Sequence, residues 1–196
     1  MIKNLALSIT LCAAVLLGCA PAPPVFTALD ITGAPGYATD FKLTDHSGKP
    51  RTLKEFQGKA VALFFGFTQC PEICPGTMLE MKQVRQALGA DADKLQVLFI
   101  TLDPKRDTPA VLSQYVPAFD PSFLGLHGTE AEIATVAKDF KIFWRVQESA
   151  NSSNYTLDHT AATLIFDTQS RLRLFVNMGT PADKIAADIQ QLLKGK

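Results

Sequence analysis

Two long apolar runs stand out in the pattern of hydrophobic and polar positions, at residues 59–68 and 95–101. Continuous apolar runs of this length are typical of strands that are buried on both faces of a sheet. Shorter strand patterns occupy residues 41–44 and 143–146, and two more flank a turn at residues 168–170. That last pair, residues 162–167 and 172–176, predicts a hairpin near the end of the chain.

Helical periodicity alternates with these strands. Apolar residues recur every three or four positions after Pro75, a residue that suits the first turn of a helix because it lacks a backbone N–H. Thr129 and Glu132 form a capping box at the start of another helix. We expect helices over residues 75–88, 108–119 with a bend or end near Pro117, 129–140 and 181–193.

The order of elements is strand, helix, strand, helix, then hairpin and helix. This order predicts an α/β fold with a central mixed β-sheet flanked by helices and closed by a C-terminal hairpin and helix. Two cysteines, Cys70 and Cys74, stand where the first long strand meets its helix. With that pair in place, the arrangement resembles a thioredoxin-like fold.

Length and charge narrow the range of functions. The chain has 196 residues, enough for one domain with a substantial core. Lysine plus arginine and aspartate plus glutamate each number 19, so the formal net charge is zero. No basic stripe is present, which argues against a nucleic-acid partner.

The N-terminus has the layout of an export signal. Lys3 precedes an apolar stretch that ends at Leu17, shorter than the roughly 18–20 residues of a membrane-spanning helix. Residues 16–19 resemble a bacterial lipoprotein box, which implies cleavage after residue 18 and a lipid on Cys19. Leu17 is bulky for its place, so an uncleaved anchor stays open, as does an ordinary buried helix. We expect a signal peptide over residues 1–18, a proline-rich tether over 19–39 and one domain over 40–196.

Cys70 and Cys74 are then the cysteines left to the exported domain, since Cys12 leaves with the signal and Cys19 carries the lipid. On one helical turn their Cβ atoms lie about 5–6 Å apart, close enough for a disulfide or for one metal ion. A helix N-terminus lowers thiol pKa values and favours the reactive thiolate. An inert structural disulfide fits the oxidising compartment but suits an exposed helix start poorly.

His159 precedes the first strand of the predicted hairpin. In a thioredoxin-like sheet that strand lies beside the one leading to the cysteines, so the imidazole should face Cys70 and Cys74. Two thiolates hold copper(I), and an added imidazole accommodates copper(II). Zinc is disfavoured, because a closed structural zinc site normally has four protein ligands. Asp158 or a backbone carbonyl can orient the ring.

Other candidate donors have simpler explanations. His46 and His127 lie in turn-like segments and are expected at the surface. Met78 and Met81 have core spacing, whereas Met178 is ambiguous.

Residues 101–109 follow the second apolar run. Asp107 or Thr108 can cap the next helix, but capping does not explain Asp103 and Arg106. Loops at the carboxyl ends of parallel strands gather near the site in open α/β sheets. We expect Asp103, Arg106 and Asp107 to brace the cysteine loop through an ion pair.

Three separated motifs now stand together: Thr68-Gln69-Cys70-Pro71-Glu72-Ile73-Cys74-Pro75, residues 101–109, and Asp158-His159-Thr160. Over roughly residues 40–194 the chain resembles the Sco/SenC/PrrC family, with Glu72 where many relatives carry aspartate. The resemblance implies a membrane-tethered domain that binds copper(I) and copper(II) through Cys70, Cys74 and His159. It implies delivery of copper to the dinuclear copper centre of cytochrome c oxidase, so the oxidase's copper-bearing subunit is the expected partner. Other periplasmic copper chaperones are further expected partners of a monomeric lipoprotein facing the periplasm or extracytoplasmic space.

Other functions stay open at this point. A thiol–disulfide oxidoreductase could reduce the oxidase's copper-site cysteines, or the pair could report redox state to a signalling partner. Three residues separate the cysteines where thioredoxins have two, and Ala161-Ala162 replaces the proline of thioredoxin-type enzymes, which favours the metal-binding hypothesis. A peroxiredoxin-like peroxidase fits less well, because Leu63 stands where its proline should be.

Overall fold

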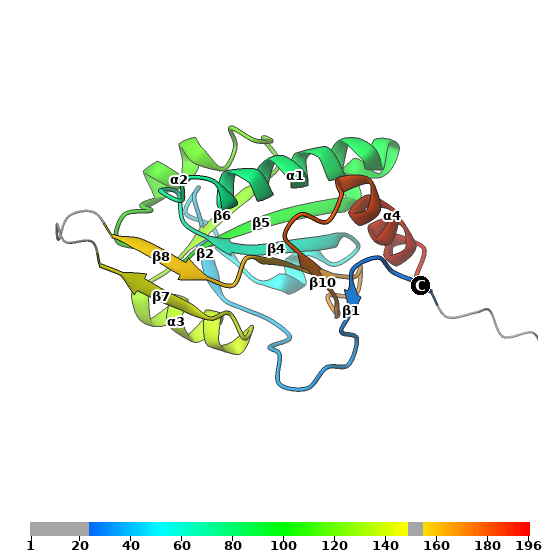
Figure 1. The fold of residues 1–196 in the computed structure, drawn as a ribbon, viewed down its shortest axis with the longest axis horizontal. Coiled ribbons are helices and arrows are strands. Elements are labelled where there is room, and N and C mark those ends of the chain that lie inside the picture. The colour runs from blue at the N-terminus through cyan, green and yellow to red at the C-terminus, as the bar shows by residue number, and fades with distance from the viewer. Residues whose placement is uncertain (1–23, 149–154) are drawn as a thin grey trace, which may run out of the picture.

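The computed structural model describes residues 24–148 and 155–196. Within these residues one sheet has eight strands in the order β1-β10-β9-β4-β5-β6-β2-β3, and β7 pairs with β8 in a separate hairpin (Figure 1). The strands are β1 (Leu29–Asp30), β2 (Leu43–Asp45), β3 (Pro50–Arg51), β4 (Ala60–Gly66), β5 (Leu95–Thr101), β6 (Leu124–His127), β7 (Trp144–Gln147), β8 (Thr156–His159), β9 (Ala162–Phe166) and β10 (Leu172–Asn177). The helices are α1 (Ile73–Leu88), α2 (Pro109–Tyr115), α3 (Glu130–Asp139) and α4 (Ala182–Leu193), with 3-10 turns at Leu53–Phe56 and Gly89–Lys94.

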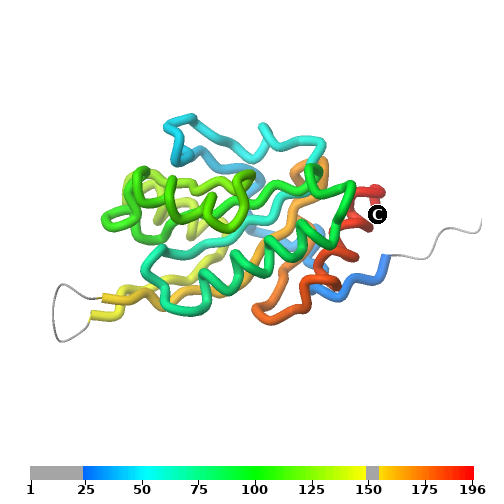
Figure 2. Tube along the Cα trace, turned by 90° about the horizontal axis from the view of Figure 1, so that it is seen from above, coloured from blue at the N-terminus to red at the C-terminus, as the bar shows by residue number. Residues whose placement is uncertain are grey.

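The centre of the sheet is formed by the two apolar runs. β4 and β5 pair in parallel over their whole length, and every residue of both strands is buried. β6 extends the parallel set, whereas β9 runs antiparallel to β4. Helices α1, α2 and α4 lie over one face and α3 lies against the other (Figures 1 and 2). The expected mixed sheet with a thioredoxin-like arrangement is confirmed.

Most of the expected elements are present. The capping box of Thr129 and Glu132 starts α3, and Thr108 caps α2, which ends before Pro117. Helix α1 begins at Ile73, before Pro75, because the first turn of a helix tolerates proline. The short strands β1, β3, β6 and β8 were not expected, because strands of two to four residues carry little periodic signal; of the strands of this length, only β2 and β7 overlapped a predicted strand.

The fold begins before the expected boundary at residue 40. Strand β1 pairs with β10. The buried carboxylate of Asp188 on α4 accepts hydrogen bonds from the backbone N–H groups of Thr27 and Ala28, at 3.0 and 2.8 Å. This segment supplies backbone partners to a sheet edge and to the buried Asp188 side chain, so it belongs to the domain. The expected signal peptide and lipid-bearing Cys19 lie outside the described residues.

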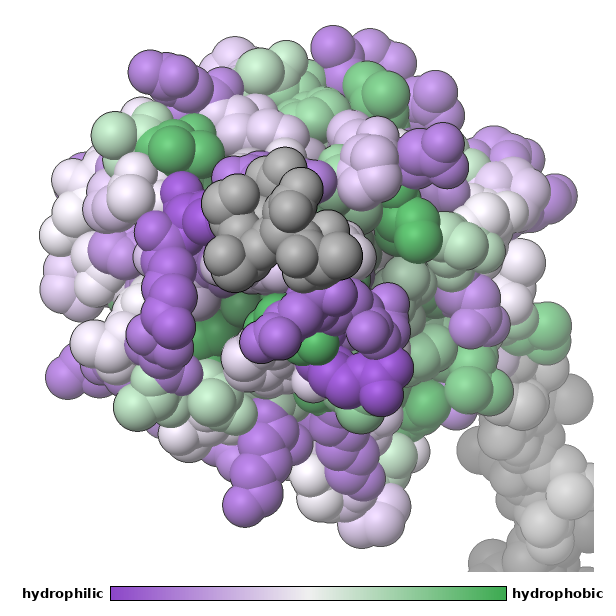
Figure 3. Space-filling view, turned by 60° about the vertical axis from the view of Figure 1, so that its left-hand side comes forward, coloured by the Kyte–Doolittle hydropathy of each residue, from purple (hydrophilic) through white to green (hydrophobic). Residues whose placement is uncertain are grey.

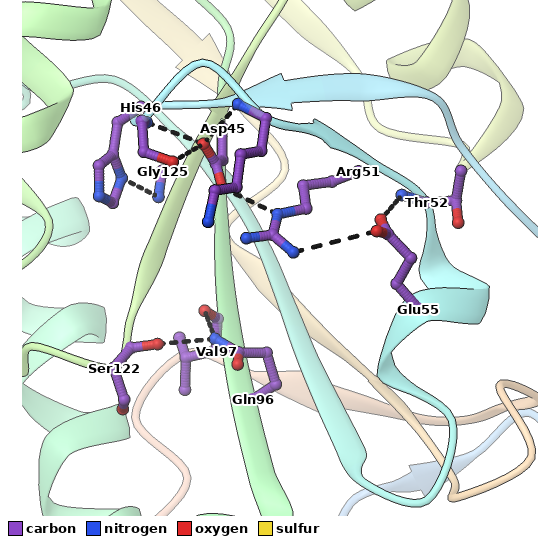
Figure 4. A network of polar contacts seen from close by, with 11 residues as sticks. Asp45, His46, Arg51, Thr52, Glu55, Gln96, Val97, Ser122 and Gly125 are labelled. Carbon is purple, nitrogen blue, oxygen red and sulfur yellow. Dashed lines mark hydrogen bonds and ion pairs between the residues drawn. The ribbon is translucent and has the colours of Figure 1, made fainter.

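A second buried carboxylate, Asp45, secures the opposite edge of the sheet (Figure 4). It accepts hydrogen bonds from the amide and hydroxyl of Ser47, the amide of Lys49 and Nε of Arg51. Burial acts to raise the pKa of Asp45, but these donors hold that pKa well below its ordinary value. The β2–β3 turn is therefore anchored by an ionised carboxylate.

Over the described part of the chain, none of the helices combines the length and the apolar character required to span a membrane.

Candidate metal centre

The two cysteines lie where β4 gives way to α1. Cys70 ends a turn in which its N–H donates to the carbonyl of Phe67, and Cys74 lies in the first turn of α1. Both thiols are free; Cys70 is half-buried and Cys74 is fully buried. The N–H of Cys74 points toward the sulfur of Cys70 at 3.4 Å. The structure thus holds one accessible and one enclosed thiol on neighbouring positions.

His159 reaches the cysteines through the sheet. It ends β8, and the next strand, β9, pairs with β4, which leads to the cysteines. As a result, Nε2 of His159 lies 3.6 Å from Sγ of Cys74, although 85 positions separate them in the chain. The expected juxtaposition of imidazole and thiol is confirmed.

The orientation of the His159 ring follows from its surroundings. Nδ1 lies 3.0 Å from the carbonyl oxygen of Thr160, which can only accept, so Nδ1 carries the proton and donates. Nε2 then presents its lone pair toward Cys74. The rings of Phe64 and Phe67 pack edge-on at 6.1 and 6.0 Å between centroids. Burial lowers the pKa of His159, which favours the neutral, ligating form.

The pKa of the enclosed thiol differs from the expectation. Burial raises the pKa of Cys74 well above its ordinary value, and a hydrogen bond from the backbone of Phe67 only partly opposes this. Desolvation disfavours the charged thiolate, and the neighbouring Cys70 acts in the same direction. The expected lowering of the pKa is therefore wrong for the free Cys74 thiol, and a metal would have to displace its proton.

A surface groove of about 320 Å³ gives access to the site. Its lining includes Cys70, Glu72, Ile73, Asp158 and His159. Strand β8 forms one side of the groove, and the β7–β8 hairpin projects from the domain (Figure 1). On the face that Figure 3 turns toward the viewer, hydrophilic and hydrophobic side chains are interspersed. In residues 24–148 and 155–196, no three cysteine, histidine, aspartate or glutamate side chains are already gathered as a metal-binding cluster.

The loop after β5 braces the cysteine loop, with Asp107 as the main contact. Its carboxylate, 1% exposed, accepts hydrogen bonds from the amide and hydroxyl of Thr68 and from the hydroxyl of Thr101. Burial raises the pKa of Asp107, and these donors act against that shift. The expected contribution of residues 101–109 to the cysteine loop thus has a direct geometric basis.

Arg106 connects three segments around the same loop. Its guanidinium forms an ion pair with Asp103, donates from Nη1 to Gln69 Oε1 at 3.1 Å and to the carbonyl of Tyr155 at 2.9 Å, and lies 3.6 Å from the centre of the Tyr155 ring. The Tyr155 hydroxyl donates to Asp103 at 2.7 Å. Tyr155 directly precedes β8, so this cluster joins the cysteine loop to the strand that carries His159.

Asp158 does not orient the imidazole by a hydrogen bond. Its exposed carboxylate accepts from Arg145, at 3.3 Å, and from Gln147, both on β7. The backbone carbonyl of Thr160 fulfils the orienting role instead. The reason is strand geometry, since successive side chains on β8 point to opposite faces. Asp158 acts on the ring through its charge, which opposes the effect of burial on the pKa of His159, as does the hydrogen bond to Thr160.

Sequence reasoning missed Tyr155 and Gly66. Tyr155 lies outside the recognised motifs, and nothing in the sequence signals its role. Gly66 stands at the end of an otherwise bulky apolar strand, and such a glycine can indicate close approach of another group. That signal was available from the sequence.

The other histidines and methionines of the described residues do not line the groove. His46 Nδ1 accepts a hydrogen bond from the amide of Gly125 (Figure 4), and Nε2 of His127 is buried, so neither is a simple surface residue. Met78 and Met81 are fully buried in the core as expected, and Met178 is exposed.

Comparison with known proteins gives consistent matches. The SCO1/SenC family model matches residues 30–194. An SCO2-like protein of Rickettsia felis is 37% identical over 158 residues, which is 80% of this chain and 75% of that protein. The mitochondrial protein SCO2 homolog of Mus musculus is 32% identical over 78% of this chain, and the match spans 60% of that longer protein.

Solved structures agree. Bradyrhizobium japonicum ScoI with copper bound has a TM-score of 0.72 and 38% identity, covering 78% of this chain and 97% of that one. Yeast Sco1 with copper bound has a TM-score of 0.75 and 30% identity, covering 83% and 91%.

Proposed function

Since this chain belongs to the SCO1/SenC family, we propose that it binds copper through Cys70, Cys74 and His159 and delivers it to the copper-bearing subunit of cytochrome c oxidase. The observation that carries the proposal is the 3.6 Å approach of His159 Nε2 to the sulfur of Cys74, with Cys70 beside it. Related proteins with copper bound support the choice of metal.

The donor set suits copper as cargo. Two sulfurs and one imidazole nitrogen are soft to intermediate ligands, which hold copper(I) and also accept copper(II). The proton on His159 Nδ1 leaves Nε2 free to bind without prior deprotonation. Cys74, in contrast, must lose its proton, because burial raises its pKa. Copper uptake should therefore release protons and strengthen with rising pH.

The different exposure of the two thiols fits a delivery role. Cys74 is fully buried, whereas Cys70 and His159 are half-buried and line the groove. A thiol of the receiving subunit can approach Cys70 first, while the other two ligands retain the ion. Copper would then pass from one thiolate to another by ligand exchange, without release into solution.

We also propose that the chain is exported, lipidated at Cys19 and membrane-tethered, with a monomeric domain facing the periplasm or extracytoplasmic space. The layout of residues 1–19 supports this. The segment after residue 24 is held to the domain by Asp188 and β10, so a tether would leave from a defined place. Other periplasmic copper chaperones remain proposed donors of the ion.

The test uses the full chain with reduced thiols. The reduced chain should bind one copper(I) ion, and Cys70→Ser or Cys74→Ser should abolish this binding. His159→Ala should retain copper(I) but weaken copper(II) binding and bleach its thiolate-to-copper absorption. His46→Ala is the matched control, since that histidine is bonded to Gly125 away from the thiols. An unchanged copper(II) spectrum in His159→Ala would remove this residue from the site.

A second candidate function is reduction of a disulfide in the oxidase's copper site. The accessible Cys70 beside the enclosed Cys74 favours it. The Cys70 thiolate attacks one sulfur of the substrate disulfide and releases the other as a thiolate, which takes up a proton. The Cys74 thiolate then attacks Cys70 and releases the second substrate thiol. Two electrons pass to the substrate, and a Cys70–Cys74 disulfide remains.

One assay separates the two functions. The copper-loaded chain is mixed with reduced copper-site fragment of the oxidase, and the metal-free chain with oxidised fragment. Copper transfer to the reduced fragment supports delivery. Reduction of the oxidised fragment without any copper transfer favours the reductase function, and His159→Ala should leave that reduction largely intact because exchange needs only the thiols.

A further inference from the structure

We propose that Gly66 is a positioning residue for the copper site, because its missing side chain creates the space in which the Cys74 sulfur lies. Gly66 is the last residue of β4, and its carbonyl accepts from Leu102 at 2.7 Å. Its φ is outside the left-handed region, so the backbone does not require glycine there. The requirement is for space. This inference rests on the proposed function.

A Cβ atom at position 66 would meet three groups at once. It would lie 2.9 Å from Sγ of Cys74, 2.8 Å from Cε1 of Phe64 and 3.0 Å from Cε2 of Phe99. Cβ atoms essentially never approach other heavy atoms this closely, so at least one group must move. Glycine at this position therefore permits the observed contact between β4 and the sulfur.

Two of these groups, the rings of Phe64 and Phe99, also belong to the packing around His159. Phe64 packs edge-on against the His159 ring, at 6.1 Å between centroids, and Phe99 packs against Phe64 at the same separation. A methyl group at position 66 would press on the Cys74 sulfur and on the ring that positions His159. The added methyl group would therefore disturb both atoms of the 3.6 Å contact between Cys74 Sγ and His159 Nε2.

All three groups are fully buried, and we expect the sulfur to be the one that yields. Phe64 and Phe99 are fully buried in the centre of the sheet, where rings have no free volume to enter. Cys74 lies in the first turn of α1, next to the groove lined by Cys70, Pro71 and Glu72. Substitution at Gly66 should therefore displace the thiol toward the groove and separate it from His159.

A matched control distinguishes positioning from ordinary overpacking. Gly125, on β6, is also tightly enclosed: a Cβ there would lie 3.0 Å from Val116 Cγ2 and 3.2 Å from Leu112 Cβ. Neither neighbour belongs to the copper site. Gly125→Ala thus crowds the core without touching the ligands.

The experiment measures copper(II) affinity and thiolate-to-copper absorption in the full chain, in Gly66→Ala and in Gly125→Ala. Gly66→Ala should lose the band or shift it and bind copper(II) about tenfold or more weakly, as when a ligand loses its supporting neighbours. Gly125→Ala should keep the wild-type band even if its Tm falls. A wild-type spectrum in Gly66→Ala, or equal loss in both variants, would overturn the inference.

Two measurements without copper keep the inference testable if the wild-type chain binds none, a result that would instead refute the proposed function. Alkylation of Cys74 should be faster in Gly66→Ala than in wild type. The Tm loss caused by Gly66→Ala should also shrink in a Cys74→Ala background, because the crowded sulfur is gone. If Gly66→Ala alone does not fold, recovery of folding in the Gly66→Ala, Cys74→Ala double variant provides the same test. Unchanged alkylation together with additive Tm losses would show that Gly66 and Cys74 are not coupled.

Discussion

The carboxylate of Asp107 holds Thr68 by two hydrogen bonds, one from the backbone N–H at 3.0 Å and one from the hydroxyl at 2.6 Å. Thr68 lies two residues before Cys70, and Asp107 lies after β5, the strand next to β4. The contact therefore holds the loop that carries Cys70 to the segment that follows the central strand β5.

Asp107→Asn should loosen the cysteine loop. Asparagine replaces one acceptor oxygen by an NH2 group, so a threonine hydroxyl must turn round to accept there, and the negative charge that strengthens the bonds from Thr68 and Thr101 is lost. The free energy of unfolding should fall by about 2–3 kcal/mol, and copper(II) affinity by about tenfold. Asp120→Asn is the control: Asp120 also accepts from a neighbouring hydroxyl and from Arg85, near the far end of α1. Normal copper affinity in Asp107→Asn would show that this brace does not position the ligands.

Arg106→Lys should detach the start of β8 from the cysteine loop. Lysine has no planar fork to bind Asp103, Gln69 and the Tyr155 carbonyl together, so conservation of charge does not rescue the contacts. Amide hydrogen exchange over residues 155–159 should accelerate, and the copper(II) band should weaken. Lys105→Met, which removes a neighbouring exposed charge paired with Glu130, should change neither. Equal exchange rates in Arg106→Lys and wild type would contradict the connecting role.

Asp158→Asn should leave the copper(II) spectrum unchanged. Its carboxylate faces Arg145 and Gln147, and the Thr160 carbonyl orients the imidazole. Loss of the nearby negative charge should only lower the pKa of His159 further, which keeps the ring neutral. A loss of absorption comparable with that of His159→Ala would mean that Asp158 turns toward the ring when copper binds.

Cys70 should react with iodoacetamide much faster than Cys74 in the reduced, metal-free chain. Cys74 is fully buried, and burial raises its pKa. Each unit by which a thiol pKa exceeds the solution pH lowers the thiolate fraction about tenfold, so the rates should differ by at least that factor near neutral pH. Mass spectrometry of peptides from a time course would show it. Equal labelling of both cysteines would place Cys74 at the surface in solution.

Asp45→Asn should lower stability in a pH-dependent way. Donors from Ser47, Arg51 and Lys49 hold the pKa of Asp45 well below its ordinary value despite burial. The stabilisation is therefore complete above about pH 4, the ordinary carboxyl range, and is lost as the pH falls toward the folded-state pKa. Near pH 7 the loss should be about 2–3 kcal/mol, because Arg51 keeps some access to water.

The matching measurement is Tm against pH for wild type, Asp45→Asn and Glu55→Gln. Glu55 is a more exposed partner of Arg51, 4.0 Å away, and its loss should have little effect. The gap between wild type and Asp45→Asn should narrow below about pH 4. A gap that is constant down to acidic pH would mean that the charge of Asp45 contributes nothing.

Much of the fold was predictable from periodicity. The runs of β4 and β5, the apolar spacing of α1 and the capping box of α3 were sufficient, because these signals are local and repeat over many residues. Strand β1 and its attachment to Asp188 were not predictable. The two residues of β1 show no periodic pattern. Their structure comes from pairing with the distant strand β10 and from the hydrogen bonds that the preceding residues donate to the buried Asp188.

The candidate site was likewise predictable only in part. The residue types Cys70, Cys74 and His159, and their places at the ends of predicted strands, follow from the sequence alone, as does the family to which the chain belongs. Only the tertiary structure decided which thiol is enclosed, that the Thr160 carbonyl rather than Asp158 orients the ring, and that Gly66 leaves room for a sulfur. Such features depend on distances between side chains from separate strands, and the pairing of β9 with β4 sets those distances. Chemical identity is a property of each residue, whereas burial and orientation arise from the packing of all the others.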